Sequence, residues 1–112
     1  MRLIVTAQNS LPQSPVDQRF GRCLWLLLLD TESNHWQAFP NPGVSQPGGA
    51  GVAAAQFVLD QQVDVVISGD FGPHAARAFS AAKVDMRLFT EDVHTVQEAV
   101  DRYHHQGLPS FQ

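Results

Sequence analysis

The stretch Val63-Asp-Val-Val-Ile-Ser-Gly-Asp-Phe-Gly-Pro-His-Ala-Ala-Arg-Ala-Phe79 decides the fold. It begins as a short buried strand, passes through a turn with two glycines and continues into a helix. Pro73 suits the first turn of that helix, where a missing N–H is tolerated. A turn of this kind leaves backbone N–H groups at the mouth of a sheet, and glycine lets an anionic ligand approach them closely.

Four further strands are expected outside this unit. Runs rich in apolar residues predict them over residues 2–7, 23–29, 36–39 and 84–89, beside the strand at 63–67. The short run at 36–39 is expected at the edge of the sheet. Pro12 and Pro15 predict a loop between the first two strands, because proline removes a donor and restricts the residue before it.

Two further helices are expected. One follows a loop rich in proline and glycine at residues 40–51, and Val52, Ala55 and Leu59 fall on one face of it. The other begins at a capping box formed by Thr95 and Glu98. The helix of the opening unit is expected to bury a stripe of small and aromatic residues, namely Ala75, Ala78, Phe79 and Ala82.

The resulting element order is β-β-β-α-β-α-β-α. The first three strands are joined without helices, so the second should run antiparallel to its neighbours. The later strands are joined through helices, so they should be parallel, with right-handed crossovers. We therefore expect a mixed five-stranded α/β sheet. Ligands of such sheets bind beyond the carboxyl ends of the parallel strands, an edge that here gathers residues 7–9, 48–51 and 68–74.

Length and composition exclude several classes of protein. The 112 residues should form one domain, residues 1–112, and 44% hydrophobic against 16% charged residues is enough for a core. A net charge of −4 argues against sequence-independent nucleic-acid binding, although Arg19 and Arg22 form a small basic patch. No apolar run approaches the roughly 20 residues that span a bilayer, so no membrane partner is expected.

The single cysteine carries information about compartment and chemistry. Cys23 alone cannot form a disulfide within the chain or a multi-cysteine zinc or iron–sulfur site. The N-terminus runs directly into a strand pattern without a secretory cleavage site. Both observations favour a cytoplasmic location.

Five motifs in register identify a resemblance to a known family. They are Val16-Asp-Gln-Arg-Phe-Gly-Arg22, Asp30-Thr-Glu32, Asn41-Pro42 with Gly48-Gly-Ala-Gly51, the stretch from Val63 to Ala75, and the helix start from Thr95 to Ala99. Over nearly its whole length the chain resembles the dinitrogenase iron–molybdenum cofactor biosynthesis family, also called nitrogenase accessory factor-like domains. The resemblance implies a ribonuclease-H-like three-layer α/β/α fold with three helices, strand order 3-2-1-4-5 and an antiparallel second strand.

The resemblance also implies a function. Members would act as non-enzymatic carriers that hold an iron–sulfur precursor cluster or the finished iron–molybdenum cofactor, with cofactor-assembly proteins as partners. The binding site would combine the first loop with the two glycine-containing turns. The expected cofactor-binding residues are Arg19, Phe20, Gly21, Arg22, Gly48, Gly49, Gly51, Gly69, Asp70 and Gly72.

Two side chains are candidates to coordinate the metal directly. The family often has histidine where this chain has Arg19, and a guanidinium can pair with an anionic cluster but cannot ligate iron. Attention therefore moves to His74, which is either a ligand or an exposed helix-start residue. Cys23 is either a thiolate ligand favoured by nearby arginines, a buried residue of an apolar strand, or a bridge between two chains.

The remaining site residues have simple structural alternatives. Asp70 would cap the following helix through its carboxylate. The glycines would form turns, a role compatible with a cradle of N–H groups for an anion.

Two other functions remain as alternatives. One is a protein-interaction or small-anion-binding module without metal, in which Trp25, Trp36 and the edge strand mediate docking or a homodimer. The other is a metal-dependent nuclease, suggested by fold analogy alone. Two-metal chemistry needs converging carboxylates, and residues 2–7 carry none.

Overall fold

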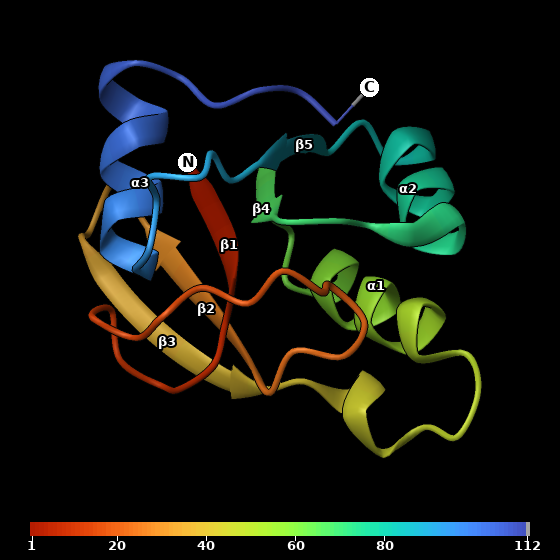
Figure 1. The fold of residues 1–112 in the computed structure, drawn as a ribbon. Coiled ribbons are helices and arrows are strands. Elements are labelled where there is room, and N and C mark those ends of the chain that lie inside the picture. Colours follow the sequence, from red (N-terminus) through yellow and green to blue (C-terminus); the bar gives the residue numbers. More distant parts are fainter. Residues whose placement is uncertain (112) are drawn as a thin grey trace.

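The computed structural model of the chain describes residues 1–111. A mixed five-stranded sheet lies between two layers of helices, in the order β3-β2-β1-β4-β5 (Figure 1). The strands are β1 (Arg2–Ala7), β2 (Trp25–Asp30), β3 (His35–Pro40), β4 (Val65–Ser68) and β5 (Asp85–Leu88). The helices are α1 (Ala50–Asp60), α2 (Gly72–Ala81) and α3 (Val96–His105), with a 3-10 helix η1 (Pro42–Ser45) before α1.

The strand directions confirm the topology predicted from the connections. β2 is antiparallel to both β1 and β3, and β4 is parallel to both β1 and β5. The register places Ile4 opposite Val66, and Val66 opposite Met86. The order 3-2-1-4-5 and the three helices expected from the family resemblance are likewise confirmed.

Each face of the sheet has its own core. Ile4, Leu26 and Val66 pack toward α1 and α2, whereas Leu3 and Ile67 pack toward α3 on the opposite face. Because both faces are covered, the central strands are apolar along their length rather than alternating with polar residues. This explains why β1, β2 and β4 read as continuous hydrophobic runs.

The helix faces differ from the prediction at two places. In α1 Ala55 is buried as predicted and Leu59 packs partly buried against the core, but Val52 is 53% exposed, and Ala54 and Val58 are buried in its place. In α2 the stripe ends at Phe79, and Ala82 is exposed at the C-cap. Alanine offers little apolar area, so the periodicity of this alanine-rich segment did not determine which side of α1 meets the sheet.

The two ends of the sheet are finished differently. At β5 the segment after α3 pairs with the strand, since Leu88 N donates to Pro109 O at 2.8 Å and Phe111 N donates to Met86 O at 3.0 Å. At the other end lies β3, the edge strand that the sequence predicted. No helix within residues 1–111 is long and apolar enough to cross a membrane.

Candidate functional site

A cavity of about 340 Å³ opens beyond the carboxyl end of β4, at the edge of the sheet predicted from the sequence. Three segments line it: residues 19–22 of the first loop, residues 49–51 at the start of α1 and residues 70–75 at the start of α2. Nine of the twelve predicted site residues lie on its wall. They are Arg19, Phe20, Gly21, Arg22, Gly49, Gly51, Asp70, Gly72 and His74.

The N-termini of α1 and α2 both open into this cavity. Neither helix has a side-chain cap, and neither carries an acidic residue in its first turn. By contrast, α3 begins with the predicted capping box, in which Thr95 Oγ1 accepts from Glu98 N and the Glu98 carboxylate accepts from Thr95 N. A helix start without a cap keeps its free N–H donors and its positive dipole end available for an anion.

Two glycines make the close packing at the cavity feasible. A Cβ on Gly21 would lie 3.1 Å from Gly51 N, so the first loop approaches the start of α1 more closely than a side chain comfortably allows. Gly72 has a φ of +71°, in the left-handed region that favours glycine. The first loop and the turn before α2 can therefore both face the helix N-termini with bare backbone.

A cluster of aromatic rings lies behind the cavity wall. The ring of Phe20 is only 1% exposed and lies 5.9 Å from that of Phe71 and 5.3 Å from that of Phe79, centroid to centroid. Phe20 therefore anchors the first loop in the core and offers its backbone, rather than its ring, to the cavity. This rigid apolar backing holds the surrounding N–H groups in place.

The charges at the cavity are mainly positive. Arg19 is 68% exposed at its side chain; its backbone N donates to the buried Asp17 carboxylate at 2.9 Å, and its Nε pairs with the same oxygen at 3.4 Å. Arg22 donates from Nη1 to Gln46 O at 3.0 Å. Asp70 is the single carboxylate on the cavity wall within the described residues, so the two arginines outnumber it there, although the Asp17 carboxylate behind the wall pairs with Arg19.

The prediction that Asp70 caps α2 is not met. The N-cap of α2 is Phe71, and no side chain caps the helix. The Asp70 carboxylate instead accepts from the N–H of Phe71, at 2.8 Å, while its backbone carbonyl accepts from Phe20 N at 3.3 Å. Asp70 thus ties the turn after β4 to the first loop, and the N–H groups within α2 stay uncapped.

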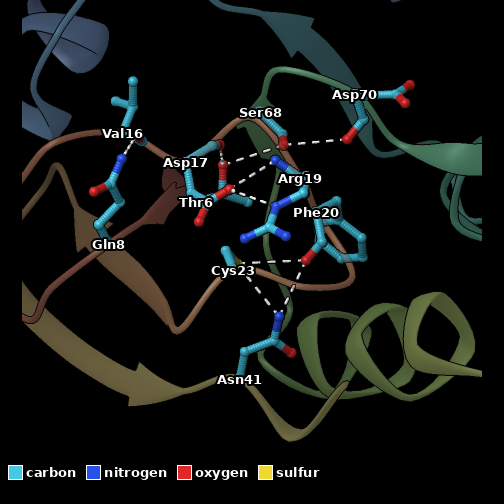
Figure 2. A network of polar contacts seen from close by, with 10 residues as sticks. All are labelled: Thr6, Gln8, Val16, Asp17, Arg19, Phe20, Cys23, Asn41, Ser68 and Asp70. Carbon is cyan, nitrogen blue, oxygen red and sulfur yellow. Dashed lines mark hydrogen bonds and ion pairs between the residues drawn. The ribbon is translucent and has the colours of Figure 1, made fainter. Parts of the chain in front are cut away.

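A buried polar network supports the cavity from behind (Figure 2). Asn41 donates from Nδ2 to Phe20 O at 3.1 Å and to Cys23 Sγ at 3.3 Å, while its Oδ1 accepts from Gly43 N at 2.9 Å. On the sheet side, Thr6 Oγ1 donates to Asp17 O at 2.6 Å. Neither Asn41 nor Thr6 was assigned a role from the sequence, although the Asn41-Pro42 motif was a signal that could have drawn attention to Asn41.

Cys23 belongs to this network and lies outside the cavity wall. It is fully buried in the loop before β2, its Sγ donates to Phe20 O at 3.4 Å, and burial raises the pKa of its thiol to about 11. A thiol in this setting is protonated at neutral pH and is a poor nucleophile or ligand. Gly48 and Gly69 also lie outside the wall, and Gly69 instead packs against Gln18.

The donor set favours one kind of binding. Within residues 1–111 no group of three or more histidine, cysteine, aspartate and glutamate side chains is arranged to hold a metal ion. The exposed His74 and Asp70 are the side chains on the cavity wall that could coordinate one. The arrangement is therefore better suited to holding a preformed anion through N–H and guanidinium donors than to building a metal site.

Comparison with known proteins places the chain in a family. The sequence profile described as dinitrogenase iron-molybdenum cofactor matches residues 1–106. The apo form of the orange protein from Desulfovibrio gigas is 30% identical, with a TM-score of 0.89 over 97% of this chain and 91% of that one. A Thermotoga protein of the DUF35 family, solved by NMR, is 24% identical and has a TM-score of 0.80 over 97% of this chain and 91% of its own.

No curated protein matches the sequence. The profile match covers nearly the whole chain, and the protein belongs to the dinitrogenase iron-molybdenum cofactor family.

Proposed function

We propose that this protein is a non-enzymatic carrier that binds an anionic metallocluster during cofactor assembly. The cargo would be the iron–molybdenum cofactor or an iron–sulfur precursor of it. One observation carries the proposal: two helix N-termini without caps and two arginines converge on one cavity of an otherwise acidic protein. The description of the family, dinitrogenase iron-molybdenum cofactor, supports the chemical class proposed for the cargo.

The cavity would hold its cargo mainly through hydrogen bonds and charge. Backbone N–H groups at Gly51 and His74 belong to the first turns of α1 and α2 and are oriented by the helix axes. Arg19 and Arg22 would add guanidinium donors that pair with the negative charge of the cluster. Since such contacts break without exchange of a covalent ligand, the cargo could be passed on intact.

His74 is the candidate for a single coordinating contact. It lies in the first turn of α2, is exposed, and lines the cavity. A neutral imidazole could occupy one open position on a cluster iron or molybdenum. Cys23, the other ligand candidate, is better placed to stabilise the loop, because its thiol is buried and hydrogen-bonded.

We further propose a cellular location and two partner proteins for this carrier. A carrier of an oxygen-sensitive cluster between assembly proteins would work in the cytoplasm and would meet a donor and an acceptor protein in turn. A homodimer is not needed for the cavity, since all of its walls come from one chain.

Anaerobic titration of the apo protein with isolated iron–molybdenum cofactor, followed by visible absorption and gel filtration, tests the proposal. We expect retention that weakens with salt and falls about tenfold or more in the variant Arg19→Gln/Arg22→Gln. The control Arg87→Gln removes an arginine that pairs with Asp85 away from the cavity and should behave as wild type. Absence of retention by the wild type contradicts the proposal.

A small oxyanion is the competing cargo, because uncapped helix N-termini also bind phosphate or sulfate. Repeating the titration with inorganic phosphate separates the two. Saturable phosphate binding without cofactor binding would identify a small-anion module instead.

A further inference from the structure

A groove runs along the surface between α1 and α2, beside the apolar residues of α1 that the sequence assigned to the core. Val52, Ala55 and Leu59 line a groove of about 320 Å³ between α1 and α2. The opposite wall comes from α2 and includes Ala78 and Ala81. Ala55 is buried in the core and Leu59 is partly buried against it, so the half-exposed Val52 is the apolar side chain of α1 that lies most open in this groove.

The groove is basic and adjoins the cavity. Its lining includes Arg77 and His74 but no carboxylate, and His74 lines both the groove and the cavity. Within residues 1–111 Arg77 takes part in no salt bridge or hydrogen bond of its side chain. In a protein of net charge −4, an unpaired arginine beside exposed apolar side chains is typical of a recognition surface.

We propose that this groove docks the protein with which the carrier exchanges its cargo, through an apolar helical segment flanked by carboxylates. From Val52 to Leu59 the groove follows about two turns of α1, roughly 10 Å, which suits a short helix with apolar residues at every third or fourth position. Carboxylates on its flank would pair with Arg77. The inference rests on the proposed carrier function for the identity of the partner.

The position of the groove explains why docking there would serve transfer. A helix lying between α1 and α2 would end beside His74, at the rim of the cavity. Its carboxylates would meet the positive field that also holds the cargo, so docking would weaken the hold on an anionic cluster at the moment of exchange. A second copy of this chain fits less well, because it would bring Arg77 against a like charge.

Two synthetic helical peptides of roughly 14 residues test this inference. Both carry the same leucines, spaced to face the groove, and one is flanked by glutamates and the other by lysines. Titrated into the ¹⁵N-labelled protein, the acidic peptide should shift the amide signals of Val52, Leu59 and Arg77, whereas the lysine peptide should not. Arg77→Glu and Val52→Ser should each weaken binding about tenfold.

Lys83→Glu is the matched control, since it makes the same charge reversal outside the groove and should change binding less than about twofold. Equal binding of both peptides, no binding, or shifts away from α1 and α2 would overturn the inference. The inference would also be overturned if sedimentation showed that the apo protein self-associates with rising concentration and that Val52→Ser abolishes this self-association. Binding of isolated cofactor is measured on the same samples: a wild type that binds cofactor but neither peptide defeats the docking inference alone.

Discussion

Gly21 and the amide of Gly51 lie so close that a methyl group on Gly21 would come within 3.1 Å of the Gly51 nitrogen. The two residues are thirty positions apart in the sequence, and their contact joins the first loop to the first turn of α1. It leaves the N–H groups at this helix start facing the cavity with no side chain above them. The architecture of the site therefore depends on a backbone-to-backbone approach.

Gly21→Ala should weaken cargo binding because the new methyl group covers the Gly51 amide. Loss of one charge-assisted hydrogen bond would lower affinity about tenfold. The measurement is the anaerobic titration with isolated cofactor. Gly48→Ala is the matched control, since a Cβ there meets nothing within 4 Å and the residue does not line the cavity; equal losses in both variants would contradict the role of the contact.

Pro73→Glu should be more stable than Pro73→Gln and should bind the cargo more weakly. The residue lies in the first turn of α2, where a carboxylate interacts favourably with the helix dipole by about 0.5 kcal/mol but competes with an anionic cargo. The control Pro73→Gln has nearly the same side-chain shape as the glutamate variant but carries no charge. In urea denaturation the glutamate variant should be the more stable of the two, whereas in cofactor titration it should bind more weakly. A glutamate variant that binds as well as the glutamine variant would disprove electrostatic capture at α2.

The Cys23 thiol should make the protein less stable in alkali. Burial raises its pKa from 9.0 to about 11, so between these pH values the unfolded chain releases a proton that the folded protein retains. Stability from this group is complete below pH 9 and falls as pH rises toward 11, by on the order of 2 kcal/mol. Between pH 8 and pH 10.5 the urea midpoint of unfolding should fall further in the wild type than in Cys23→Ala.

The same burial predicts that Cys23 resists alkylation in the folded state. Iodoacetamide at pH 8 should modify it only after unfolding in urea. Rapid modification of the native protein would show that the loop before β2 opens and would restore Cys23 as a ligand candidate.

Asn41→Ala should destabilise the fold by about 2 kcal/mol, because it leaves the buried Gly43 N–H without its acceptor and removes a donor from Phe20 O. Chemical denaturation measures the change. Asn9→Ala, an exposed site, should stay within about 0.5 kcal/mol of the wild type. If both variants are equally stable, the network in Figure 2 does not hold the first loop in place.

Much of the fold could be predicted because its signals are local. The continuous apolar runs of β1 and β2, Pro73 in the first turn of α2 and the capping box of Thr95 each depend on neighbours in the sequence. The face of α1 was predicted only in part: Ala55 is buried as expected, but alanines dominate this helix, and the choice between Val52 and Val58 depends on which element packs alongside.

The site was predictable to a similar extent and for a similar reason. Its glycines and arginines were recognised because a motif places them at the carboxyl edge of the sheet. The absence of a cap on α2 was not recognised, since it appears only when Asp70 is seen to bind Phe71 N rather than the helix interior. The network role of Cys23 and Asn41 arises from a contact between loops eighteen residues apart.

Paramagnetic broadening tests the central claim most directly. Isolated iron–molybdenum cofactor, added anaerobically to the ¹⁵N-labelled protein, should broaden the amide signals of Gly21, Gly51, Gly72 and His74 while those of α3 remain sharp. Unchanged spectra, or broadening centred away from the cavity at the starts of α1 and α2, would contradict the account.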